Sequence, residues 1–306
     1  MSPTRSEVRE GDMTSRVYIA KKVRHDGLKH PTDGMRDSSQ AIDRTPDLGY
    51  DELWNLQNDF YKRWISPNNR KEAESINSTI FSQSIQGRVS DTRTFVGREL
   101  NTEYIFGLFM PSESLSIIGN PLDYEIIQFA AVRNIAAATT RVNFTFPAFN
   151  NISLPVVINT WMTWDAARQI TQYDVVFKWF GNLLQTLILS LGGSAEEASK
   201  KTVDKIATSV CNSHARFCNG TNLQYESWDD CYSFLTEDIR VGLSFELGMN
   251  TLMCRSVHEL MVKYRPNVHC SHIGPTGGGE CDDSVTYIEK ATEALNANSP
   301  WLTNGL

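Results

Sequence analysis

The fold class is decided by residues 151–180, "NISLPVVINTWMTWDAARQITQYDVVFKWF". This segment contains two runs rich in β-branched and aromatic residues, joined by the short stretch WDAARQI. Polar and apolar residues alternate around Asn159–Thr163 and again around Gln172–Lys178, which is the two-residue period of a half-buried strand. We therefore predict two antiparallel strands with WDAARQI as the hairpin connection.

The residues before this hairpin divide into helical and extended patterns. The stretch YEIIQFAAVRNIAAATTRVNFTFPAF, residues 124–149, has the same β-branched and aromatic texture and predicts further strands. Earlier, Leu53, Leu56, Phe60 and Trp64 recur at helical spacing. Residues 70–85 and 91–109 are interpreted as two more helices. Helices followed by strands predict an α+β domain, with the helices packed on one face of a curved antiparallel sheet.

Composition places limits on function and organisation. The chain has 306 residues, 41% hydrophobic and 21% charged, with a net charge of -7. A mildly acidic chain without a basic stripe argues against nucleic acid as the partner. No apolar run approaches the roughly 18 residues of a membrane span, and no dinucleotide fingerprint indicates a redox cofactor. We predict a disordered or loosely attached extension at 1–48, the α+β domain at 49–190 and a helical, Cys-rich region at 191–306.

The stretch RPNVHCSHIGPTGGGECDD, residues 265–283, allows several interpretations. His269, Cys270, His272 and Cys281 are metal-ligand types, but adjacent residues rarely reach one ion and no CxxC pair occurs. GPTGGG lacks the Lys-Ser/Thr of a phosphate-binding loop. A Cys–His nucleophile pair also stays open. Disulfides are favoured, in any of fifteen connectivities, and no metal site is predicted; the six candidates are Cys211, Cys218, Cys231, Cys254, Cys270 and Cys281.

The predicted compartment follows from these cysteines. Disulfides favour a secreted, extracellular protein. Four N-x-S/T sequons, at Asn77, Asn143, Asn151 and Asn219, add only little weight to a glycoprotein. The N-terminal residues contain no apolar signal segment, so a cytoplasmic location remains the alternative.

The hairpin also carries a resemblance to a known family. A strand Thr160–Trp164, an Asp-containing turn from Asp165 to Arg168, and a strand with Tyr173-Asp174-Val175 resemble the nuclear-transport-factor-2-like (NTF2-like) fold in its SnoaL-like polyketide-cyclase branch. The whole chain also resembles filamentous-fungal proteins that end in a similar HC-x-HIGPTGGG segment. The resemblance implies a cone, with a bent sheet wrapped around helices and a deep apolar cavity. It also implies acid/base chemistry on polyketide-like molecules, or binding alone.

Candidate site residues follow from this resemblance and from the residue types. Asp174 falls on the matching Asp, and a carboxylate that faces an apolar cavity would have a raised pKa suited to acid/base catalysis; an outward-facing Asp174 paired with Arg or Lys is the alternative. The other candidate acids are Asp123 and Glu103, and the substrate-binding candidates are Tyr173, Trp161, Asn159, Arg133 and Asn143. Histidines expected of a dehydratase of this fold are absent from 49–190, because His25 and His30 precede it and the others lie beyond residue 210.

Two functions remain at this point. The first is a cofactor-independent cyclase, isomerase or dehydratase, a pericyclase included, that acts on a hydrophobic natural-product intermediate of fungal secondary metabolism. The second is a secreted, disulfide-stabilised protein that binds a small molecule or serves a structural role without catalysis. A hydrophobic small molecule is the expected partner in either case, and a homodimer is the expected assembly.

Overall fold

The computed structural model describes residues 46–110 and 115–293, which lie within one compact unit. The predicted extension at 1–48 lies almost wholly outside the described residues. At its end, Leu48 is buried and its backbone N–H donates to the Arg133 carbonyl at 2.8 Å. The first half of this unit contains α1 (Tyr50–Trp64), α2 (Asn69–Ser75), β1 (Phe81–Val89), β2 (Thr94–Val96), α3 (Arg98–Ile105), β3 (Asn120–Val132), β4 (Ile135–Phe146), β5 (Ile152–Trp164) and β6 (Ile170–Phe177).

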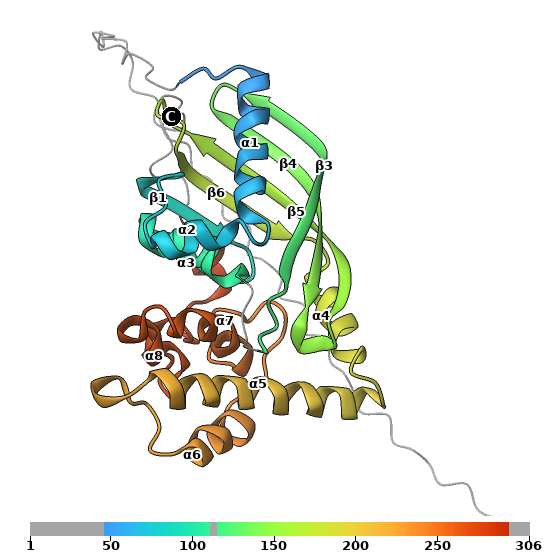
Figure 1. Cartoon of the computed structure of the whole chain (residues 1–306), viewed down its shortest axis with the longest axis vertical. Coiled ribbons are helices and arrows are strands. Elements are labelled where there is room, and N and C mark those ends of the chain that lie inside the picture. The colour runs from blue at the N-terminus through green and yellow to red at the C-terminus, as the bar shows by residue number, and fades with distance from the viewer. Residues whose placement is uncertain (1–45, 111–114, 294–306) are drawn as a thin grey trace, which may run out of the picture. The chain divides into compact units, whose positions relative to one another are not determined.

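The strands form one six-stranded sheet in the order β2-β1-β6-β5-β4-β3. The predicted hairpin is confirmed: β5 and β6 pair antiparallel, and the Asp165 N–H donates to the Gln169 carbonyl in the connection. The prediction of an entirely antiparallel sheet is wrong at one place, because β1 runs parallel to β6. The α+β class is confirmed, with helices on the inner face of the sheet (Figure 1).

The helical interpretation of residues 70–85 and 91–109 is only partly right. Helices α2 and α3 lie within these ranges, but residues 81–89 and 94–96 are strands. A β-bulge between Phe81 and Gln86 shifts the register of β1 against β6. Phe81 and Ile85, four residues apart, are buried, whereas Gln83 between them is exposed and Ser82 is buried in its place. This spacing imitates a helical stripe and conceals the two-residue period of a strand.

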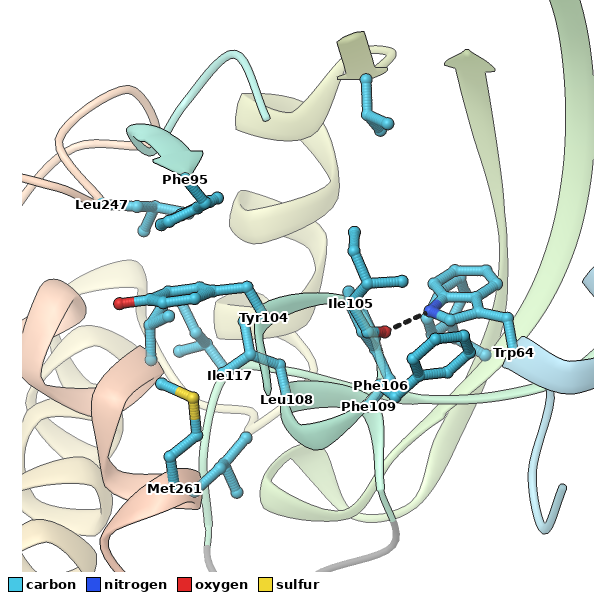
Figure 2. Close-up of a cluster of buried hydrophobic side chains, with 14 of the residues drawn as sticks. Trp64, Phe95, Tyr104, Ile105, Phe106, Leu108, Phe109, Ile117, Leu247 and Met261 are labelled. Atoms are coloured by element: carbon cyan, nitrogen blue, oxygen red, sulfur yellow. Dashed lines mark hydrogen bonds between the residues drawn. The ribbon is translucent and has the colours of Figure 1, made fainter. Parts of the chain in front are cut away.

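Aromatic side chains pack around the space between the inner face and the helices. Leu53, Phe60 and Trp64 of α1 are buried against the sheet. The indole N–H of Trp64 donates to the Ile105 carbonyl at 2.8 Å, and its ring meets Phe109 edge-on at 4.9 Å between centroids (Figure 2). This buried hydrogen bond fixes α1 relative to α3, so the first helix and the third form one wall.

The second half of the unit is helical and held by disulfides. It contains α4 (Phe180–Leu189), α5 (Ala195–Phe217), α6 (Trp228–Ser233), α7 (Leu252–Val262), α8 (Pro266–Ile273) and α9 (Tyr287–Thr292). The disulfide prediction is confirmed, with pairs Cys211–Cys231, Cys218–Cys270 and Cys254–Cys281. Three disulfides are compatible with an oxidising compartment. No helix in the described ranges is both long and apolar enough to cross a membrane.

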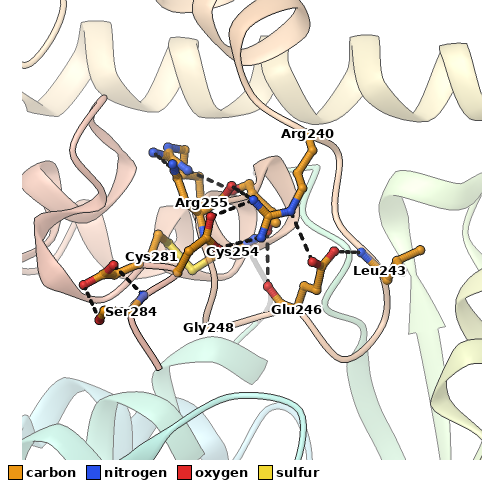
Figure 3. A network of polar contacts seen from close by, with 12 residues as sticks. Arg240, Leu243, Glu246, Gly248, Cys254, Arg255, Cys281 and Ser284 are labelled. Carbon is orange, nitrogen blue, oxygen red and sulfur yellow. Dashed lines mark hydrogen bonds and ion pairs between the residues drawn. A yellow bond between two sulfur atoms is a disulfide. The ribbon is translucent and has the colours of Figure 1, made fainter. Parts of the chain in front are cut away.

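The Gly-rich stretch is a turn built around a buried arginine. Arg255 of α7 has no exposed surface, and its guanidinium donates to the carbonyls of Gly274 at 3.1 Å and Pro275 at 3.0 Å. Gly277 has φ +68°, and a Cβ there would lie 2.8 Å from the Cβ of Cys281. Figure 3 shows Arg255 beside the Cys254–Cys281 disulfide. Glycine is therefore required at this point for the disulfide to pack against the turn.

Candidate functional site

An apolar cavity lies between the inner face of the sheet and the helices. The cavity has a volume of about 90 Å³, counted as the space that the centre of a water-sized sphere can occupy, and it opens to solvent. The sheet contributes alternate residues of β5, among them Val156, Ile158 and Met162, because successive strand residues point to opposite faces. The aromatic residues that line the cavity are Phe60, Tyr61, Trp64, Phe95, Tyr104, Phe109, Phe144, Phe146, Phe177 and Phe180. Such a lining suits a flat, hydrophobic molecule.

A small group of hydroxyls forms a polar patch on the otherwise apolar wall of the cavity. The hydroxyls of Tyr61, Thr140 and Thr160 are buried close to one another, and the contacts among them do not have the geometry of full hydrogen bonds. Burial raises the pKa of Tyr61 to about 12, although the two threonine hydroxyls oppose the rise. Tyr61 therefore stays protonated at neutral pH and has a proton to donate. A ligand oxygen on the cavity wall would give the buried Tyr61 hydroxyl a well-aligned hydrogen-bond partner.

Asp91 contributes a carboxylate to the cavity. Among the described residues that line the cavity, it is the one acidic side chain. It follows β1, and its Oδ2 accepts a hydrogen bond of 3.0 Å from the Ser90 hydroxyl. Burial raises the pKa of Asp91 above its ordinary value, while the hydroxyl of Ser90 and the charge of Lys290 oppose this. A carboxylate with a raised pKa in an apolar cavity has the properties of a general acid or base.

Tyr104 connects the cavity to a buried cluster of histidines. Its ring stacks on Phe95 with 3.8 Å between centroids, and its hydroxyl lies 3.1 Å from Nδ1 of His258. Figure 2 shows the ring beneath Phe95, with the hydroxyl directed away from Trp64. Burial raises the pKa of Tyr104 well above its ordinary value. Burial lowers the pKa of His258 well below its ordinary value, and the neighbouring His272 and His269 lower it further.

Glu103 lies on the other side of this cluster. Its Oε1 accepts from Arg265 at 2.7 Å, and its Oε2 lies 3.2 Å from Nε2 of His269. Burial works to raise the pKa of Glu103, but the hydrogen bonds and charges of His269 and Arg265 outweigh burial, so the net pKa is lowered. Nδ1 of His269 lies 3.2 Å from Nδ1 of His272, whose pKa is lowered to about 4 by burial and by His269.

The structure places Asp174 away from the cavity. Because Tyr173 points inward, Asp174 points to the outer face of the sheet. There it forms an ion pair with Arg88, with 2.6 Å between Nη2 and Oδ2. This is the outward-facing arrangement that the sequence left as the alternative, and it does not agree with the expectation of a cavity-facing Asp174. Asn159 and Trp161 line a shallow groove beside Asp174 on the same outer face.

The other predicted site residues are dispersed. Asn143 donates to Asp123 at 2.7 Å on an exposed part of β3 and β4. Arg133 lies in the turn between β3 and β4, with φ +57°, and not within a strand. Tyr173 is buried on the inner side, where its ring lies against Phe81 and its hydroxyl has no hydrogen-bond partner among the described residues. Of the predicted acids, Glu103 alone lies in a buried polar cluster.

Sequence reasoning missed Asp91, Tyr61 and Tyr104. It weighed His269 and His272 as metal ligands, with His258 as a residue that could complete the site, but did not favour that interpretation. Asp91 follows a strand that was interpreted as helix, so its position at the cavity was hidden. The histidines lie more than 150 residues from Glu103 and Tyr104 along the chain. The HC-x-H motif was a visible signal, but it could not show which side chains lie opposite.

Comparison with known proteins assigns the chain to a family. Residues 58–175 match the BfoA N-terminal domain, and residues 174–284 match the BfoA family C-terminal domain. The chain belongs to the BfoA family. BfoA-family relatives include "Bifonsecin B biosynthesis cluster protein A" of Aspergillus brasiliensis, 47% identical over 86% of this chain and 90% of that protein. They also include "Aurasperone B biosynthesis cluster protein A" of Aspergillus niger, 47% identical over 84% of this chain and 85% of that protein.

Similarity to solved structures is much weaker. A putative isomerase from Rhodopseudomonas palustris is 14% identical, with a TM-score of 0.32 over 45% of this chain and 94% of that one. A hypothetical protein with a ketosteroid isomerase-like fold from Catenulispora acidiphila is 11% identical, with a TM-score of 0.34 over 46% of this chain and 95% of that one. These similarities are too slight to assign a cone fold to the BfoA family, so the NTF2-like and SnoaL-like assignments stay predictions. The matches to the two BfoA domain models meet near residue 175, and the described residues lie within a single compact unit.

Proposed function

We propose that this protein binds a hydrophobic intermediate of fungal secondary metabolism in the internal cavity and cyclises, isomerises or dehydrates it without a cofactor. The observation that carries the proposal is the placement of Asp91, a carboxylate with a raised pKa, among aromatic cavity walls. The names of the Aspergillus relatives, which belong to biosynthesis clusters, support the metabolic context.

The residues on the cavity wall suit chemistry next to a carbonyl group. Asp91 takes a proton from the carbon beside the carbonyl, and the electron pair moves onto the oxygen, which accepts a hydrogen bond from the Tyr61 hydroxyl. The resulting enol returns the proton at another carbon in an isomerisation, attacks a second carbonyl in a cyclisation, or expels a β-hydroxyl as water in a dehydration. Protonated Asp91 then supplies the proton that the product or leaving group requires.

Genetic complementation tests this proposal and identifies the substrate in the same experiment. The gene is deleted in the producing fungus, the accumulated intermediate is identified by mass spectrometry, and variants are reintroduced. We expect Asp91→Asn to leave the intermediate unconverted. Asp174→Asn is the matched control, because it is the same change on the opposite face of the sheet, where Asp174 pairs with Arg88.

The complementation assay also distinguishes the two carboxylates. Asp174 remains the competing assignment, in which the outer groove with Trp161 and Asn159 would hold the substrate. Conversion that is lost in Asp174→Asn and retained in Asp91→Asn would move the chemistry to that groove. Conversion by both variants would remove acid/base catalysis from the proposal.

A second function, binding without catalysis, is favoured by one specific observation. The buried hydroxyls of Tyr61 and Thr160 on the cavity wall can form hydrogen bonds with a ligand, and recognition alone does not require Asp91. In that case the protein carries a metabolite, and the disulfides serve a secreted, extracellular carrier. The purified protein would then release an unchanged small molecule on denaturation, and the deletion strain would lose transport or stability of a product but no reaction step.

A further inference from the structure

Three histidine rings converge in the interior, outside the cavity chemistry proposed above. His258 comes from α7, and His269 and His272 come from α8. All three are buried, and one ring nitrogen of each lies within 4.8 Å of the others. We propose that His258, His269 and His272 bind a divalent transition-metal ion of the class that prefers imidazole ligands, with Zn²⁺ as the first choice.

The distances between the rings suit this ion. Tetrahedral zinc with Zn–N bonds of about 2.0–2.1 Å holds its ligand nitrogens about 3.3 Å apart. Nδ1 of His269 and Nδ1 of His272 are 3.2 Å apart. A ring nitrogen of His258 lies within 4.8 Å of the ligand nitrogens of both other histidines, and its ring centroid lies 4.8 Å from that of His272. Three histidines and one open position is a known ligand arrangement for zinc.

The surroundings orient the rings as ligands. The other nitrogen of His269, Nε2, faces the carboxylate of Glu103 at 3.2 Å, the partner that metal-bound histidines commonly have. His269 and His272 are three residues apart on α8 and therefore share a face. Gly278 packs on His272: a Cβ at this residue would lie 2.7 Å from the Cδ2 of His272. The turn thus holds the ring in place.

The nearby cysteines are not part of this ligand set. Cys254 and Cys281 lie near His258, but they are joined as a disulfide and carry no thiolate. The site is therefore a nitrogen site in the oxidised protein. A bound ion would fix α7 and α8 to each other, next to Tyr104 on the cavity wall.

Metal content of the oxidised, full-length chain tests the proposal. The protein is produced without a polyhistidine tag, treated with EDTA, incubated with ZnCl₂ and desalted, and zinc per chain is measured by mass spectrometry. We expect one zinc in the wild type and almost none in His269→Gln and His272→Gln. The matched control is His214→Gln, because His214 is also buried in the helical half but accepts hydrogen bonds from the backbone of Gln224 and Tyr225. It should keep the zinc.

Two further measurements do not depend on the folding of those variants. Co²⁺ bound to the wild type should show a tetrahedral absorption spectrum without a thiolate charge-transfer band. Glu103→Gln should still bind one zinc but with an affinity about 10–100-fold lower in competition with a chelator. Loss of all zinc from the wild type on desalting, equal zinc in the histidine variants, or a thiolate band in the cobalt spectrum would each overturn the proposal.

Discussion

The Gly-rich turn offers a matched pair of substitutions whose costs can be worked out from the structure. Gly277 and Gly279 both have left-handed backbone conformations, with φ +68° and φ +80°. An alanine in this conformation lowers the free energy of unfolding by about 1–2 kcal/mol. About 0.4–1 kcal/mol of this loss is offset, because alanine reduces the conformational entropy of the unfolded chain. A Cβ at residue 279 meets nothing within 4 Å, whereas one at 277 lies 2.8 Å from the Cβ of Cys281.

The two alanine variants should therefore differ. Gly279→Ala should lower the free energy of unfolding by about 1 kcal/mol, which is the backbone cost alone. Gly277→Ala should lower it by about 2–4 kcal/mol, because overpacking adds about 1–3 kcal/mol. Urea unfolding followed by tryptophan fluorescence measures both values under oxidising conditions. Equal losses in the two variants would refute the reasoning, since the close approach to Cys281 would then carry no cost.

Three other predictions concern the fold and the cavity carboxylate. Replacing Cys218 and Cys270 by alanine should lower the free energy of unfolding by about 4 kcal/mol, and replacing Cys211 and Cys231 by about 3 kcal/mol, because the bridges span 52 and 20 residues; urea titrations of both double variants check the order. Arg255→Met should cost more than about 3 kcal/mol, because buried carbonyls lose their donor and each costs about 1–3 kcal/mol; a melting temperature unchanged from wild type would contradict this. Burial raises the pKa of Asp91 in the folded state above its ordinary value of 3.8. Below pH 3.8 the carboxyl group is protonated in both the folded and the unfolded state. As the pH rises through the folded pKa, the folded protein must hold a buried negative charge, so the free energy of unfolding falls. Asp91→Asn should therefore remove this loss and be the more stable protein at neutral pH, which unfolding curves across a pH series will show.

Local sequence patterns predicted those elements whose contacting residues are close to each other in the sequence. The hairpin at 151–180 was predictable because alternation and a short polar turn leave one pairing that buries the apolar face. The pairing of the six cysteines was not predictable, since residues such as Cys218 and Cys270 meet only after the helices between them have packed. The same limit explains β1, where a bulge gave a strand the spacing of a helix.

Local pattern and composition were enough to establish the α+β class, the presence of disulfides and the abundance of aromatic side chains that could line a cavity. Which carboxylate lies at that cavity depends on how the strands pack. Strand alternation directs Asp174 outward to Arg88, whereas the end of β1 brings Asp91 to the aromatic walls. The tertiary structure also brought the histidines beyond residue 210 to Glu103 and Tyr104, because the packing of α7 and α8 against α3 depends on contacts between segments more than 150 residues apart.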